Sequence, residues 1–71
     1  MSPQEYEVTI CPLSAEDGGG FGARVPDLPG CMSDGETPEE ALANAYDAIA
    51  CWMEAADEMG FPVPEPRRAA A

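Results

Sequence analysis

The chain has 71 residues, 45% of them hydrophobic, and a formal net charge of -11. A chain of this length forms one small domain, which on folding buries only about 60% of the surface of its unfolded chain. Fourteen acidic residues against three arginines, with no lysine or histidine, exclude a phosphate-binding surface, so we expect no direct contact with nucleic acid. The small core predicts stabilisation by self-association, as a dimer or a tetramer.

The three cysteines, Cys11, Cys31 and Cys51, are interpreted as small buried hydrophobic residues. They form no CxxC pair, and no histidine is present to complete a zinc site, so we expect neither a metal nor a cofactor. The first residues lack the charged and apolar regions of a leader, and no apolar run reaches the ~18 residues of a membrane span. These features predict a cytoplasmic protein without a membrane segment.

An alternating pattern predicts the first strand, because Tyr6, Val8 and Ile10 alternate with polar residues as in a half-buried strand. Pro12 ends this strand or confines it to a sheet edge. Residues 14–20 contain three consecutive glycines and are predicted to form a flexible hairpin tip. No Lys, Ser or Thr follows these glycines, so they do not form a phosphate loop.

A return strand is predicted over residues 21–25 and a short third strand around residues 31–33. The connection between them, residues 26–30, is too short for a crossover helix and therefore favours antiparallel neighbours. Within it, Pro26 and Pro29 fix φ and favour two successive turns.

Glycines mark the turns on both sides of the third strand. Gly30 and Gly35 are predicted to adopt positive φ, with Asp34 as a turn residue before Gly35. The only long helix is predicted to begin after Thr37, whose hydroxyl caps the amide of Glu40. Glu40 is expected to reach back to the amide of Thr37, which would complete a capping box.

The helix is predicted over residues 38–59, with Gly60 in the left-handed position that ends it. Its apolar residues recur every three or four positions and form one stripe that is expected to cover the sheet: Leu42, Ala45, Tyr46, Ile49, Trp52, Met53 and Ala56. The fold class is therefore α+β, a three-stranded antiparallel sheet packed against one long helix.

After Gly60, Phe61 is expected to fold back onto the last helical turn, and three alternating prolines hold residues 62–66 extended. The predicted domain covers residues 1–66, and residues 67–71 are predicted to be a disordered tail. Met32, Met53 and Met59 are interpreted as gap-filling core residues, with an exposed patch of Met59 and Phe61 as the alternative.

No catalytic set can be assembled from these residues, because the chain has no histidine and its carboxylates are spread over positions that face solvent. We therefore expect no enzymatic activity. The acidic balance favours a basic protein partner, with solubility alone as the alternative. The acids near the end of the helix lack a neighbouring cation that would offset the helix dipole. The predicted contact residues are these three acids and two turn acids: Glu54, Asp57, Glu58, Asp27 and Asp34.

The segment Pro26-Asp27-Leu28-Pro29-Gly30-Cys31, followed by Gly35-Glu36-Thr37-Pro38-Glu39-Glu40-Ala41, strongly resembles the HicB antitoxin family over about residues 6–66. The resemblance implies an incomplete RNase H-like domain without the catalytic acids, in which a short extra edge strand is possible. It also implies a protein that neutralises a HicA-type toxin, a small basic mRNA-cleaving RNase, by covering its active site. The chain is similar to the short stand-alone form, without a DNA-binding domain. The alternative is therefore a solitary HicB-like oligomer with a structural or small-ligand-binding role and no cognate toxin.

Overall fold

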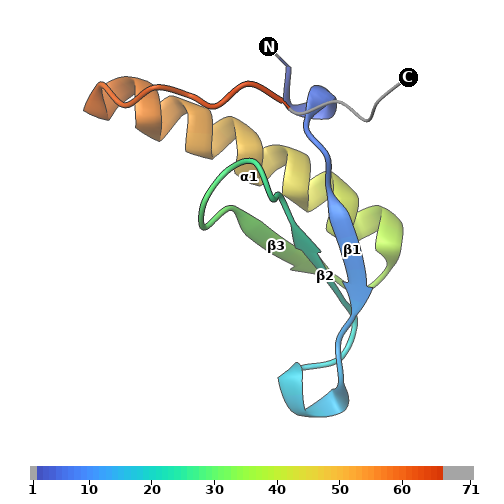
Figure 1. Cartoon of the computed structure of the whole chain (residues 1–71). Coiled ribbons are helices and arrows are strands. Elements are labelled where there is room, and N and C mark those ends of the chain that lie inside the picture. Colours follow the sequence, from blue (N-terminus) through green and yellow to red (C-terminus); the bar gives the residue numbers. More distant parts are fainter. Residues whose placement is uncertain (1, 67–71) are drawn as a thin grey trace.

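The fold is seen in a computed structural model that describes residues 2–66 (Figure 1). A 3₁₀ turn, η1 (Pro3–Glu5), precedes strand β1 (Thr9–Pro12). A second 3₁₀ turn, η2 (Ala15–Asp17), lies at the hairpin tip before β2 (Phe21–Arg24). Strand β3 (Met32–Gly35) then leads into the long helix α1 (Pro38–Met59). The α+β prediction is therefore confirmed, and the disordered tail predicted for residues 67–71 lies outside the described residues.

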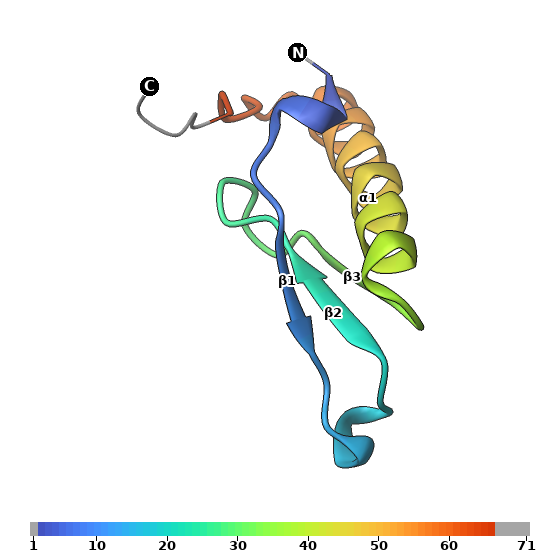
Figure 2. The ribbon, with the colours of Figure 1, turned by 90° about the vertical axis from the view of Figure 1, so that its right-hand side faces the viewer.

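The sheet is an antiparallel meander in the order β1-β2-β3. Ile10 pairs with Ala23, which pairs with Ser33, so these three residues share one face of the sheet. Figure 2 shows the sheet as one layer and α1 as the other. Among residues 2–66 the sheet has three strands, without the short extra edge strand that the resemblance made possible. Pro12 is the last residue of the edge strand β1, as predicted.

Small residues allow the first half of α1 to approach the sheet closely. Ala23 of β2 packs with Ala41 and Ala45 of α1, all three buried. Ala41 therefore occupies the core position for which the sequence indicated Leu42, which is only half-buried. The strand β3 and the start of the helix are in close contact here, since a Cβ atom at Gly35 would lie 2.5 Å from the backbone nitrogen of Ala41.

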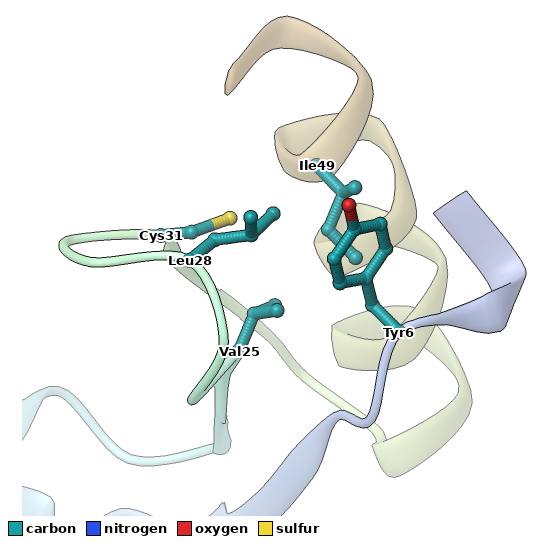
Figure 3. Packing of buried hydrophobic residues seen from close by; sticks show 5 residues of the cluster. All are labelled: Tyr6, Val25, Leu28, Cys31 and Ile49. Carbon is teal, nitrogen blue, oxygen red and sulfur yellow. The ribbon is translucent and has the colours of Figure 1, made fainter. Parts of the chain in front are cut away.

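The second half of α1 covers larger side chains that come from outside the sheet. Figure 3 shows Leu28, Val25 and Cys31 pointing toward Ile49 of α1 and the ring of Tyr6. Leu28 is only 1% exposed, although it lies in a loop. The core therefore extends from the sheet onto the loop between β2 and β3.

The segment after α1 runs back along the helix towards η1 (Figure 1). The hydroxyl of Tyr6 donates a hydrogen bond to the carbonyl of Pro64, and Val63 packs against the same core cluster. This segment, residues 61–66, contains no strand, in agreement with its alternating prolines. It joins the two ends of the described chain across the core.

Candidate partner-binding surfaces

The loop between β2 and β3 consists of two successive turns, as the prolines predicted. The amide of Leu28 donates to the carbonyl of Val25, and the amide of Cys31 donates to the carbonyl of Leu28. Pro26 and Pro29 each occupy the second position of a turn, where proline is favoured. Gly30 follows with a φ of 77°, as predicted. Both turns place Leu28 between them and direct its side chain into the core.

Trp52 attaches this loop to the helix. Its indole N–H donates to the carbonyl of Pro29 at 3.0 Å, while its ring packs against the core cluster. The half-buried Trp52 is thus part of the core, as its place in the apolar stripe indicated. The loop is therefore held on one side by Leu28 and on the other by Trp52.

Asp27 lies in the first turn, close enough to Tyr6 to affect its ionisation. Burial raises the pKa of Tyr6, and the carboxylates of Asp27, Glu5 and Glu65 raise that pKa further. Asp27 is thus a turn residue of intermediate exposure that interacts with its surroundings, and it is not an isolated surface charge.

The start of α1 differs from its prediction in two details. The hydroxyl of Thr37 accepts from the amide of Glu40 at 3.1 Å, which confirms the cap. The carboxylate of Glu40, however, accepts from the amide of Glu36 at 3.3 Å, one residue before the predicted partner Thr37. Gly35 has no positive φ and lies in β3, so its predicted turn role was wrong.

Gly35 is instead required by close packing. A Cβ atom at this position would lie 2.5 Å from the backbone nitrogen of Ala41. The neighbouring Asp34 is likewise a strand residue rather than a turn residue, and its carbonyl accepts from the side chain of Asn44 at 2.8 Å. Both contacts join β3 to the first turns of α1.

A concave surface of about 470 Å³ lies between the hairpin tip and the start of α1. Its lining is polar and includes Asp34, Glu36 and Glu40 beside the backbone of the glycines at the tip. Within residues 2–66, no three His, Cys, Asp or Glu side chains are grouped in a way that would hold a metal ion. The arrangement offers hydrogen-bond acceptors to a cationic group and no nucleophile with a base.

The structure divides the five predicted contact residues into separate groups. Glu54, Asp57 and Glu58 are exposed on the last two turns of α1, on one side of the helix. Asp34 contacts Asn44, which lies roughly 15 Å along the helix from Glu54 at 1.5 Å per residue. Asp27 belongs to the loop near Tyr6. These five residues therefore do not form one continuous site.

Two exposed apolar regions were missed or left as alternatives by the sequence reading. Met59 and Phe61 are 69% and 62% exposed at the end of α1, so Met59 does not fill the core and Phe61 does not bury itself on the helix. Met32 is 63% exposed on the sheet. The interpretation of Met32 and Met59 as core residues was therefore wrong. The spacing of apolar residues in the sequence does not show which face of the sheet the helix covers, or where that cover ends.

Met32 belongs to the face of the sheet that α1 does not cover, which we call the outer sheet face. Pairing of β2 with β3 places Met32 opposite Arg24 and Asp34 opposite Gly22 on this face. The face contains a groove of about 220 Å³. Its lining residues come from all three strands and the loop after β1: Thr9, Cys11, Leu13, Gly22, Ala23, Arg24 and Met32.

The cysteines also differ from expectation. Cys31 is buried, and this burial raises its pKa. Cys11 and Cys51 are exposed, which contradicts the interpretation of all three as buried residues. Cys11 lines the groove of the outer sheet face. In the part of the chain that the structure describes, no helix is both long and apolar enough to cross a membrane.

Comparison with known proteins finds relatives that match most of this chain. A UPF0150 protein of Synechocystis is 40% identical over 62 residues, covering 87% of this chain and 77% of the relative. A UPF0150 protein of Thermoplasma acidophilum is 33% identical over 52 residues, covering 73% of this chain and 75% of the relative.

A longer phage protein carries the same kind of sequence. An uncharacterized 14.9 kDa protein of Haemophilus phage HP1 is 44% identical over 45 residues, which are 63% of this chain and 32% of the phage protein. Residues 6–71 match the family described as HicB-like antitoxin of bacterial toxin-antitoxin system. Since this match covers nearly the whole chain and includes the double turn, the cap and α1, the chain belongs to the HicB-like antitoxin family.

Proposed function

We propose that this chain is a protein-binding antitoxin that neutralises a basic, HicA-type mRNA-cleaving toxin by covering its active site. The observation that carries the proposal is the family match over residues 6–71. Family membership favours a non-enzymatic role. The proposal places the chain in the cytoplasm, where mRNA is cleaved.

The charge distribution supports a basic protein as the partner. The chain has fourteen acidic residues, and in the described part no charged side chain is buried. These carboxylates therefore remain at the surface, where they attract a cationic protein and speed its encounter. Arg24 is the only Lys or Arg among residues 2–66, so the described surface offers little to a phosphate backbone and we assign it no direct contact with nucleic acid.

The test is to look for an adjacent gene that encodes a small basic protein and to purify that protein together with this chain. We expect the two proteins to co-purify at low salt and to separate as salt is raised, because charge attraction contributes to the complex. In a cleavage assay, a molar excess of this chain is expected to protect mRNA from that protein. Unchanged cleavage in the presence of excess folded chain would rule out the antitoxin function.

A second candidate function, a self-associating domain with a structural or small-ligand-binding role, is favoured by the outer sheet face. This face combines the exposed Met32 with an apolar groove and carries both Arg24 and Asp34. A second copy placed face to face can pair Arg24 of one chain with Asp34 of the other. Because this face carries a cation, two copies of this acidic chain repel each other less there than at a purely acidic surface.

Sedimentation equilibrium of the wild type and Met32→Ser tests this candidate. A dimer or tetramer that Met32→Ser dissociates would support association through the outer sheet face. A wild type that stays monomeric at high protein concentration would contradict it. Association without any effect on the toxin would favour the solitary oligomer over the antitoxin.

A further inference from the structure

The C-terminal end of α1 projects beyond the sheet and the β2–β3 loop (Figure 1). The buried line of the helix runs through Ile49, Trp52 and Ala56 with spacings of three and four. Met59 continues this line by three more residues, but at this position the side chain is 69% exposed. Phe61, two residues later, is 62% exposed. Of the three large apolar side chains that are exposed within residues 2–66, two therefore lie at the C-terminal end of α1.

The backbone that carries these two side chains is fixed by the cap of the helix. The amide of Phe61 donates to the carbonyl of Ala56 at 2.8 Å, and the amide of Gly60 donates to the carbonyl of Asp57 at 3.2 Å. With Gly60 at a φ of 75°, this is a Schellman motif. A partner that contacts Met59 and Phe61 therefore needs to order side chains only, which lowers the entropic cost of binding.

The same end of the helix is negatively charged. Glu54, Asp57 and Glu58 are exposed there, and the last turn contains no basic residue. The two Schellman bonds engage the carbonyls of Ala56 and Asp57. The C-terminal end of a helix carries a partial negative charge, which adds to the charge of the three carboxylates. No cation in that turn offsets either charge.

We propose that this end surface, formed by Met59, Phe61, Glu54, Asp57 and Glu58, is where the basic partner docks. This inference rests on the proposed antitoxin function and specifies the surface that performs it. Met59 and Phe61 insert into an apolar depression on the partner, and cations around that depression pair with the three carboxylates. In protein interfaces, buried anchor residues at the centre usually provide most of the binding free energy, and polar or charged residues surround them.

Charge decides between a basic partner and a second copy at this surface. Two copies meeting there would bring together three carboxylates and a negative helix end from each chain. Repulsion between them opposes that contact, whereas a cationic surface gains attraction from the same groups. The end surface therefore favours a basic partner, whereas the outer sheet face, which carries both Arg24 and Asp34, can accept a second copy.

The experiment measures binding by calorimetry, with a cleavage-inactive variant of a HicA-type toxin encoded in the same operon as the probe. Met59→Ser combined with Phe61→Ser is expected to weaken binding at least about tenfold. Met32→Ser is the matched control, since it removes an equally exposed methionine from the outer sheet face, and it should bind as the wild type does. Circular dichroism checks that all variants are folded.

A second pair of variants tests the charges. Asp57→Asn with Glu58→Gln is expected to weaken binding at low salt and to approach the wild type at high salt, where the attraction is screened. Glu7→Gln with Glu16→Gln is the control, since it neutralises two exposed carboxylates away from the end surface, and it should have a much smaller effect. If the wild type fails to bind the toxin, the proposed function fails and this inference with it. If the wild type binds and both end-surface variants bind equally well, only the docking surface is wrong.

Discussion

Gly35 shows how one residue sets the distance between the two layers. A Cβ atom there would lie 2.5 Å from the nitrogen of Ala41 and 2.8 Å from the carbonyl carbon of Glu40. These are backbone atoms of a capped helix start, which cannot move without disturbing the cap at Thr37. We expect Gly35→Ala to destabilise the domain by about 3 kcal/mol, at the upper end of the range for overpacking. Urea unfolding measures this change.

Gly22→Ala is the matched control, because Gly22 lies on the neighbouring strand and has an ordinary φ. Its added Cβ would approach the end of the Leu13 side chain, at 3.2 Å, which can rotate away. The expected change in stability is below about 1 kcal/mol, since the loss of glycine flexibility in the unfolded chain offsets part of the crowding. Equal effects of the two substitutions would show that Gly35 is not a contact point.

Tyr6 gives the domain a pH dependence in the alkaline range. Burial, followed by the charges of Asp27, Glu5 and Glu65, raises the pKa of its phenol in the folded state. The folded state therefore holds this proton more tightly than the unfolded state does. The resulting stability is fully present below the ordinary tyrosine pKa of about 10 and is lost as pH rises through the folded pKa.

Tyr6→Phe isolates this contribution. At neutral pH the variant lacks the hydrogen bond to Pro64 and should be about 1 kcal/mol less stable. Above about pH 10 the wild type should lose stability faster than the variant, so that their unfolding curves converge. Cys31, whose pKa is also raised, is present in both proteins and cancels in the comparison. A constant difference across the whole pH range would contradict the assignment.

Among the elements, the β2–β3 loop is attached to the helix by the hydrogen bond that Trp52 donates to Pro29. Trp52→Phe keeps an aromatic ring against the core but removes the donor that contacts the carbonyl of Pro29 at 3.0 Å. We expect a loss of about 1 kcal/mol, together with faster hydrogen exchange of the Cys31 amide in the loop. Exchange of the Ala41 amide, which bonds Thr37 at the other end of α1, should follow global stability only. Uniform acceleration at both amides would mean that Trp52 does not act on the loop.

The elements that the sequence predicted correctly are those specified by local chemistry. Pro26, Pro29 and Gly30 define two turns through their own backbone preferences, and Thr37 and Gly60 define the two ends of α1 in the same way. Each signal acts within a few residues of its position, so it can be read without knowledge of the rest of the fold.

The features that the sequence did not predict depend on contacts between distant residues. Tyr6 and Pro64 are 58 positions apart, and the closeness of Gly35 to Ala41 arises from packing of a strand on a helix. Likewise, the sequence identified exposed acids but not their separation into groups. Whether Met59 is covered depends on where the sheet ends beneath the helix, which no periodic pattern records.

For the whole molecule, the net charge of -11 predicts opposite responses to salt in the free chain and in its complex. Raising salt from about 0.01 M to about 1 M shortens the Debye length from about 30 Å to about 3 Å. Repulsion among the exposed carboxylates of the free chain then decreases, so its urea midpoint should rise. Attraction to a basic toxin decreases as well, so the dissociation constant of the complex should increase. A complex that resists high salt while the free chain is stabilised would mean that apolar contacts, such as those of Met59 and Phe61, dominate binding over charge.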